Sequence, residues 1–254
     1  MTVRDKKMEK LTMYHCVNCG AEVEELYRRY CPNVLKLLKC DKCDHLADKY
    51  IEYDPVIILV DLILLEKKAY RHLLYNCDLK SCWKLVIVLW LVESFRNLSL
   101  CDNNKPNIEN SRMFQFNFEG HCNLYLILLN TAVSLAAFVF VVVLLTKFKW
   151  YFSAKNTNKC NITLLTKALV IGGSSKLLGL LEITWRHIFL APDYLLILGY
   201  TLLSLLTAYS VVSNSGKLES LIILGMSIIS YNCASNFLST TFEIFGLIQL
   251  FIFH

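Results

Sequence analysis

Four cysteines near the start of the chain have the type and spacing of metal ligands. They form two pairs, Cys16 with Cys19 and Cys40 with Cys43, each with two intervening residues, and twenty residues separate the pairs. This pattern is typical of a zinc ribbon or knuckle, in which four thiolates hold Zn²⁺ tetrahedrally. Four protein ligands leave no open position for a substrate, so we expect a structural Zn²⁺. Soft thiolates also accept iron, so the spacing alone leaves the metal open.

Short turns and strands must position these thiols. Gly20 follows the first pair, where a left-handed backbone is often needed. We expect residues 21–30 to form a short helix or a strand, Cys31-Pro32-Asn33 a turn, and residues 34–39 a strand leading to the second pair. A head of about forty residues is too small for a self-sufficient core, so metal binding is expected to supply much of its folding free energy.

The other cysteines share no common spacing, and we expect them to be small buried hydrophobic residues. They are Cys31, Cys77, Cys82, Cys101, Cys122, Cys160 and Cys233. His15 and His45 flank the two spaced pairs and could each replace a cysteine as ligand. Metal-binding thiolates must stay reduced, which favours a head that faces the cytosol.

The rest of the chain has the composition of a membrane protein. Of the 254 residues 55% are hydrophobic, the mean hydropathy is +0.43, and residues 124–146 and 195–212 contain no Asp, Glu, Lys or Arg. Such runs are long enough to cross a bilayer as helices. The net charge is +5, but the basic residues form no compact stripe along the sequence, which argues against a nucleic-acid partner. We therefore expect a four-cysteine zinc head on an all-α multi-span membrane domain.

The organisation along the chain follows from these patterns. We expect a flexible tail over residues 1–12, the zinc-binding domain over 13–53, an amphipathic helix over 54–78, and about four to six membrane segments over 79–254. Residues 218–253 could form one tilted span or a hairpin broken near Tyr231-Asn232. The lysines that follow residues 124–146 indicate a cytosolic loop. A crossing by residues 84–100 places the head in the cytosol too, in agreement with the thiol argument, whereas without that crossing the same rule places the head in the lumen. These lysines are Lys147, Lys149, Lys155 and Lys159.

A helix is expected from Pro55 to about Asn76, with Asp54 as its N-cap. At 100° per residue four polar residues fall on one narrow stripe of that helix, and much of the remaining surface over residues 56–65 is apolar. The helix could lie in the membrane interface, form half of a re-entrant element, or simply support the membrane domain. The stripe residues are Asp54, Asp61, Lys68 and His72.

No catalytic motif of the hydrolase, metalloprotease, phosphate-loop or dinucleotide-binding type is present. We therefore expect a protein that is not an enzyme. Charged groups at membrane depth are costly and should pair, face the bundle interior or mark a pathway. The candidates for such groups are Lys176, or the pair Glu182 and Arg186. The alternative is that residues 163–190 lie at the membrane interface with their charges snorkelling to water.

The head and the segment after it resemble the Arv family of eukaryotic endoplasmic-reticulum proteins. The resemblance covers about residues 14–76 and is carried by both cysteine pairs and two longer stretches. These read CVNCGAEVEELYRRY, then CDKC, then ADKYIEYDPVIILVDLILLEKKAYRHLLYN. Family members can have a glycine-containing turn where this chain has Cys31-Pro32-Asn33. Beyond residue 76 the similarity is one of general pattern.

The resemblance implies an endoplasmic-reticulum membrane protein that mediates intracellular sterol and sphingolipid transport and homeostasis and supports glycosylphosphatidylinositol anchor synthesis. Its implied partners are membrane lipids (sterol, sphingolipid or a glycolipid precursor) and a membrane enzyme complex of anchor synthesis. The alternative is a non-catalytic scaffold subunit of a lipid- or glycolipid-modifying complex. In the family interpretation residues 50–76 dock the head on the cytosolic leaflet or on a partner. The expected contact residues are Tyr50, Asp54, Asp61, Tyr70, Arg71 and His72.

Overall fold

The computed structural model describes residues 13–31, 34–77, 82–103, 124–152, 161–180, 192–213 and 216–252. The chain divides into two compact units, residues 1–80 and 81–254. The expected fold class is confirmed, since the first unit holds short strands around four clustered cysteines and the second is helical. The tail expected over residues 1–12 lies outside the described residues, as does most of the expected turn at Cys31-Pro32-Asn33.

Two small hairpins build the head. Strand β1 (Tyr14–His15) pairs antiparallel with β2 (Glu22–Val23), and β3 (Tyr27–Cys31) pairs antiparallel with β4 (Val34–Leu37). An isolated bridge joins Lys39 to Leu46. The segment between the cysteine pairs is therefore stranded, which settles the choice between helix and strand that the sequence left open.

The single helix expected from Pro55 to about Asn76 is wrong. Four short segments follow the second cysteine pair instead: the 3₁₀ turn η1 (Lys49–Glu52), α1 (Pro55–Ile63), α2 (Lys67–Arg71) and the π-helix η2 (His72–Asn76). The chain turns at Leu65, whose φ of 60° is left-handed. Such a conformation costs a non-glycine residue roughly 1–3 kcal/mol.

Packing on both sides of this turn offsets the cost. Ile58 and Leu62 of α1 and Ala69 of α2 pack in one cluster with Val17 and Tyr50. A straight helix could not bring both its ends back onto the same small core. The break also removes the single polar stripe, because Asp61 and His72 now belong to segments that run in different directions.

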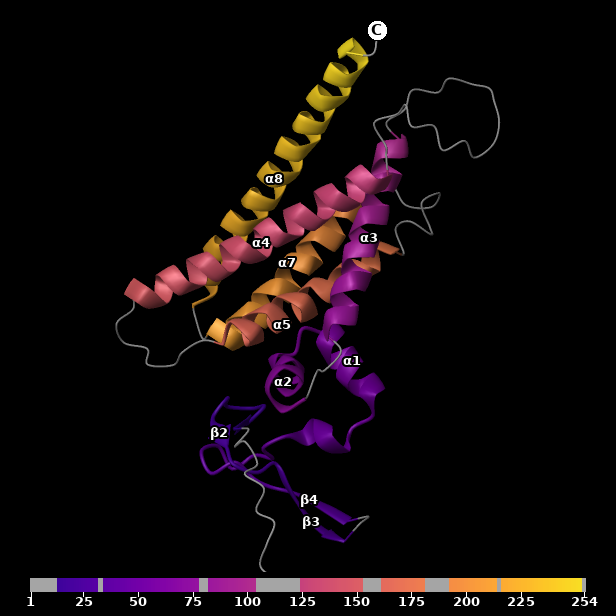
Figure 1. The fold of residues 1–254 in the computed structure, drawn as a ribbon. Helices are drawn as coiled ribbons and strands as arrows, with labels where there is room; N and C mark the ends of the chain where they lie inside the picture. The colour runs from indigo at the N-terminus through magenta and orange to yellow at the C-terminus, as the bar shows by residue number, and fades with distance from the viewer. Residues whose placement is uncertain are drawn as a thin grey trace, which may run out of the picture. The chain divides into compact units, whose positions relative to one another are not determined.

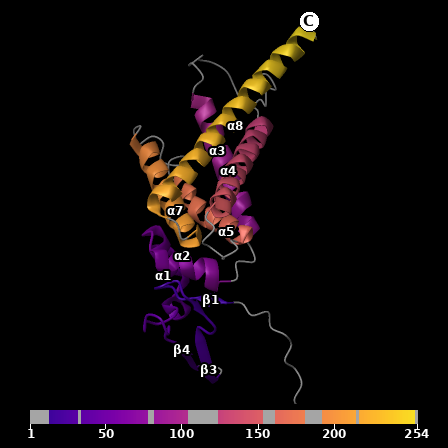
Figure 2. The ribbon, with the colours of Figure 1, turned by 90° about the vertical axis from the view of Figure 1, so that its left-hand side faces the viewer.

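The second unit is a helical bundle of α3 (Cys82–Asn103), α4 (Leu124–Phe152), α5 (Ile162–Gly173), the 3₁₀ turn η3 (Ser174–Leu178), α7 (Pro192–Ser213) and α8 (Lys217–Ile252). Helix α4 lies along α8, and α5 lies along α7 (Figures 1 and 2). Buried apolar side chains from α4, α5, α7 and α8 form its core. They include Val142, Leu165, Leu169, Leu205, Tyr209 and Leu224.

Three of the described helices are long and apolar enough to cross a membrane: Leu124–Tyr151, Leu195–Ser213 and Lys217–Phe242. They confirm that this is a membrane protein. Helix α8 is continuous past Tyr231, so the hairpin alternative for this segment is wrong. Helix α3 covers the segment expected to cross at residues 84–100, but it carries several charges and is not among the three, so its crossing stays a prediction.

A close approach of α5 and α7 depends on Gly172. A Cβ added there would lie 3.0 Å from Leu205 Cα and 3.1 Å from Ala208 Cβ. Gly172→Ala should therefore push the two helices apart and destabilise the second unit by about 1–3 kcal/mol. At Gly173 the nearest atom, on Leu89, is 4.0 Å from the added Cβ, so Gly173→Ala is the matched control. Thermal unfolding of both variants in detergent tests this, and equal stabilities would contradict it.

Candidate functional site

The first cysteine pair sits in a tight turn closed by backbone hydrogen bonds. The Gly20 amide donates to the Cys16 carbonyl at 2.8 Å, and the Cys16 amide donates to the Ala21 carbonyl at 2.8 Å. Gly20 has a φ of 79°, which confirms the left-handed residue expected after this pair. This backbone turns both thiols to the same side of the loop.

The second pair repeats this arrangement. The Asp44 amide donates to the Cys40 carbonyl at 2.9 Å, and the Cys40 amide donates to the His45 carbonyl at 2.8 Å. Asp44 takes the place of Gly20 and is also left-handed, with a φ of 56°. Aspartate tolerates this conformation better than most residues. The two knuckles are therefore built alike although their sequences differ after the second cysteine.

The four sulfur atoms fit a tetrahedral metal site. All four Sγ atoms lie within 4.8 Å of one another, with 3.8 Å between Cys16 and Cys43 and 3.6 Å between Cys19 and Cys40. Zn–S bonds of about 2.3 Å in tetrahedral geometry require sulfurs about 3.8 Å apart. The four expected ligands therefore come together. His15 and His45 are not in the cluster, and each lies near a backbone carbonyl oxygen, of Gly20 and of Cys43 respectively.

The environment of the thiols governs the protons that a metal must displace. Burial raises the pKa of Cys16 to about 12, although backbone amides of the knuckle oppose the shift. Burial also raises the pKa of Cys19, but hydrogen bonds from the Ala21 backbone and from Cys40 lower it to about 7. Metal binding at neutral pH must therefore release a proton from Cys16, so affinity rises with pH.

Polar side chains from α2 and η2 hydrogen-bond to the backbone of the first knuckle. Arg71 Nη1 donates to the carbonyl oxygens of Val17 and Asn18 at 3.0 and 2.7 Å. The Asn76 side chain accepts from the His15 amide and donates to its carbonyl oxygen, both at 2.9 Å. These bonds join the knuckle to residues more than fifty positions away and hold it in place.

A buried carboxylate lies at the centre of this network. Asp48 is fully buried and contacts His72 Nδ1 at 2.7 Å. It also accepts from the Asn76 side chain at 2.6 Å and from the Tyr50 amide at 3.0 Å. Tyr50 in turn donates its hydroxyl to Asp61 at 2.8 Å, and Lys49 lies 3.8 Å from the same carboxylate.

The structure thus accounts for most of the expected contact residues as parts of the head. Tyr50, Tyr70 and His72 are buried, and their side chains, like those of Asp61 and Arg71, are bonded within it. Asp54 is exposed at the N-cap of α1, with no side-chain capping bond. Contact of these residues with a lipid or a partner stays a prediction. Asp48 and Asn76 belong to the stretch that carries the family resemblance, but sequence reasoning did not single them out.

The Asp48–His72 pair predicts a pH-dependent head. Burial alone lowers the pKa of His72, but hydrogen bonds to Asp48 and Cys77 and the charges of both groups raise it to about 9. A histidine whose pKa is higher in the folded state stabilises fully below about pH 6.5 and loses this contribution as pH rises through about 9. The loss should reach about 3 kcal/mol.

Hydrogen exchange of head amides in the full chain at pH 6.5, 8 and 9.5, corrected for intrinsic rates, measures this effect. His72→Gln should remove most of the pH dependence. A head equally protected across this range would contradict the assignment.

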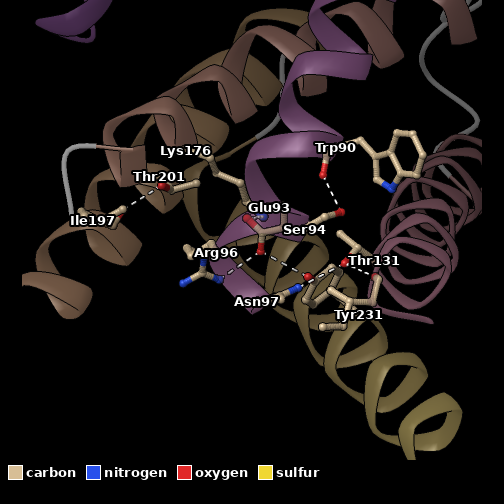
Figure 3. A network of polar contacts seen from close by, with 11 residues as sticks. Trp90, Glu93, Ser94, Arg96, Asn97, Thr131, Lys176, Ile197, Thr201 and Tyr231 are labelled. Atoms are coloured by element: carbon tan, nitrogen blue, oxygen red, sulfur yellow. Dashed lines mark hydrogen bonds and ion pairs between the residues drawn. The ribbon is translucent and has the colours of Figure 1, made fainter. Parts of the chain in front are cut away.

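A second buried polar cluster lies within the helical unit (Figure 3). Glu93 of α3 is buried and receives three partners: Arg96 Nη2 at 3.0 Å, Lys176 Nζ of η3 at 3.3 Å and the Tyr231 hydroxyl of α8 at 3.2 Å. Lys176 also lies 5.4 Å from the centre of the Tyr231 ring. The expectation that Lys176 pairs is confirmed, while Glu182 and Arg186 lie outside the described residues.

Helix α8 places this cluster well inside a candidate span, Lys217–Phe242. Lys149 and Glu219 form an ion pair near the start of that helix, and Tyr231 lies about 18 Å further along it. That is more than half the thickness of a hydrocarbon core of about 30 Å. Sequence reasoning noted Glu93 only as an interruption of an apolar segment, because its partner Tyr231 is 138 positions away.

The outer face of α1 is apolar and exposed. Val56 and Leu64 are 66% and 67% exposed, and four further aliphatic side chains of this segment are at least 45% exposed. Lys67 and Lys68, directly after the turn at Leu65, are exposed as well. The four aliphatic residues are Ile57, Leu59, Val60 and Ile63.

Comparison with known proteins extends the resemblance beyond the head. Residues 15–209 match the profile of the Arv1-like family, which covers the four-cysteine cluster and the helices as far as α7. Protein ARV1 of Homo sapiens is 32% identical over 204 residues, covering 80% of this chain and 74% of its own length. Protein ARV1 of Bos taurus is 33% identical over 207 residues, and Protein ARV 2 of Arabidopsis thaliana is 40% identical over 108. No solved structure matches the chain. The chain belongs to the Arv1-like family.

Proposed function

We propose that this Arv1-like protein acts in the endoplasmic-reticulum membrane, where it mediates sterol and sphingolipid transport and homeostasis and supports glycosylphosphatidylinositol anchor synthesis. The observation that carries the proposal is the exposed apolar face of α1 on a head with four clustered cysteines, in a chain whose other unit contains three candidate spans. A face of this kind suits contact with lipid rather than with water. The family resemblance supplies the lipid classes.

The head contributes a fixed surface in this proposal. A structural Zn²⁺ held by Cys16, Cys19, Cys40 and Cys43 would stabilise both knuckles. Helix α1 then lies in the interface of the cytosolic leaflet with its aliphatic side chains among the acyl chains. Lys67 and Lys68 suit anionic headgroups at the same level. The need for reduced thiols and the lysines that follow residues 124–146 support the cytosolic side.

The protein is proposed to act without covalent chemistry on its lipids. It would bind a sterol, a sphingolipid or a glycolipid precursor and pass it on, or present it to the enzyme complex of anchor synthesis. The cluster around Glu93 supports this proposal, because polar groups buried among membrane helices commonly mark substrate sites.

Mass spectrometry of the full chain purified in mild detergent tests the proposal. Co-purified lipids and proteins are compared between the wild type, Cys40→Ser/Cys43→Ser and a control, Cys82→Ser/Cys233→Ser, which removes two thiols outside the cluster. We expect sterol or sphingolipid enriched over the membrane average with the wild type and the control. Lipid at background level in all three samples would contradict a lipid-handling role.

The same samples distinguish the scaffold alternative. A stoichiometric lipid-modifying enzyme that is lost only with the Cys40/Cys43 variant would identify a zinc-headed adaptor. Lipid retained without any protein partner would identify a carrier. Turnover of a lipid substrate by the purified protein alone would overturn both non-enzymatic functions.

A further inference from the structure

A thiol, an imidazole and a carboxylate are joined in a row by two consecutive contacts in the head. Cys77 Sγ lies 3.1 Å from His72 Nε2, and His72 Nδ1 lies 2.7 Å from Asp48 Oδ2. Cys77 is half-buried, whereas His72 is 6% exposed and Asp48 is fully buried. Only the sulfur end of this row is therefore accessible from outside. The metal cluster does not use any of the three groups.

The π-helix η2 creates this alignment. Its winding places residues five apart above one another, and the Cys77 amide donates to the His72 carbonyl oxygen at 3.0 Å. An α-helix would instead stack Asn76 over His72. Here the Asn76 amide group holds Asp48 from the other side at 2.6 Å. Single π-helical turns are uncommon and often occur at functional sites.

This order of groups is that of an activated nucleophile. A histidine beside a thiol takes its proton and leaves a thiolate, and a carboxylate on the other ring nitrogen fixes the tautomer and stabilises the imidazolium. The Tyr50 ring, 5.3 Å from the imidazole, closes another side. Among the described residues Asp48 and Cys77 are the titratable groups in hydrogen-bond contact with His72. Burial of the ring favours transfer within this row over exchange with solvent.

We infer that Cys77 is an activated thiol that accepts a long-chain acyl group from an acyl thioester. The position of the thiol supports this class of donor. Cys77 ends the head five residues before α3 begins at Cys82, and the head carries the exposed apolar face of α1. Cysteines next to a membrane segment, which α3 is predicted to be, are typical acylation sites, and a second hydrophobic anchor converts weak interfacial binding into stable binding. The acyl chain would thus secure the head that the proposed function places on the bilayer.

The step balances without an oxidant or an added energy source. Cys77 enters as the thiolate of a thiolate–imidazolium pair with His72, and its sulfur attacks the carbonyl carbon of the donor. The new C–S bond to Cys77 forms, and the bond to the carrier thiol breaks. The proton on His72 passes to the departing thiolate, so one thioester replaces another. Asp48 is a positioning residue, since it acts only through the imidazole.

The test uses the reduced full chain in nanodiscs with palmitoyl-coenzyme A. Peptide mass spectrometry should find one palmitoyl group on Cys77 that hydroxylamine removes. Cys82 is the matched control, because it is an equally half-buried free thiol next to the same segment. His72→Gln should slow acylation of Cys77 at least tenfold and leave Cys82 unchanged. The zinc content of each variant shows whether the head has kept its fold.

Alkylation of wild-type protein by iodoacetamide separates the two parts of the inference without any substitution. Cys77 should react at least tenfold faster than Cys82 between pH 6 and 7.5, where an ordinary thiol is mostly protonated. Equal alkylation rates for Cys77 and Cys82 would overturn the proposal that Cys77 is activated. Fast alkylation of Cys77 without acyl transfer from palmitoyl-coenzyme A would overturn the proposal that an acyl thioester is its reaction partner. Neither result bears on the lipids that co-purify with the protein, so this inference and the proposed function fail separately.

Discussion

Cys40→Ser/Cys43→Ser should abolish metal binding and unfold the head while the helices of the second unit persist. Only two thiolates would remain, and the knuckles have little apolar core of their own beyond the cluster around Tyr50. Structural zinc contributes about 10–16 kcal/mol in zinc-finger peptides, more than a head of this size can replace. Among the variants considered, this one should have the largest effect.

Metal analysis together with limited proteolysis measures this outcome. The wild type should carry one zinc per chain and resist cleavage over residues 13–77, whereas the variant should lose both properties. Circular dichroism should remain strongly helical because α3 to α8 do not depend on the metal. Cys82→Ser/Cys233→Ser should behave as wild type. One metal ion retained per chain in the Cys40/Cys43 variant would contradict the assignment of all four cysteines as metal ligands.

Glu93→Ala should destabilise the helical unit by about 3–5 kcal/mol, because it removes a buried carboxylate shared by two cations. Arg96 and Lys176 would keep their charges in a low-dielectric environment without this partner. The Tyr231 hydroxyl would also lose its acceptor. The three contacts join α3, η3 and α8, so their loss should loosen the helices against one another.

Glu219→Ala is the matched control, since it breaks an ion pair between α4 and α8 in which Glu219 is largely exposed. Exposed pairs contribute little, so this variant should unfold close to the wild-type temperature. Thermal unfolding of the three proteins in the same detergent gives the comparison. If Glu93→Ala and Glu219→Ala were equally stable, the buried cluster would not be a stabilising element.

The sequence by itself was sufficient wherever a property depends on neighbouring residues. The spacing within each cysteine pair identifies a knuckle, because four consecutive residues and one left-handed residue set the direction of both thiols. The length of an apolar run identifies a span, because the bilayer sets the length that a helix needs. The four metal ligands and the membrane helices α4, α7 and α8 were predictable on these grounds.

Tertiary structure alone decided the features that depend on distant residues. The turn at Leu65 contradicts the local helical pattern, and it forms because packing against Val17 and Tyr50 outweighs the cost of a left-handed leucine. The contact between Asp48 and His72 spans 24 positions, and the contact between Glu93 and Tyr231 spans 138. No local sequence pattern could therefore predict either contact. The alignment of Cys77 on His72 needs a π-turn, which the sequence pattern does not distinguish from an α-helix. Local geometry thus determined the metal ligands and the spans, whereas packing between distant segments determined what surrounds them.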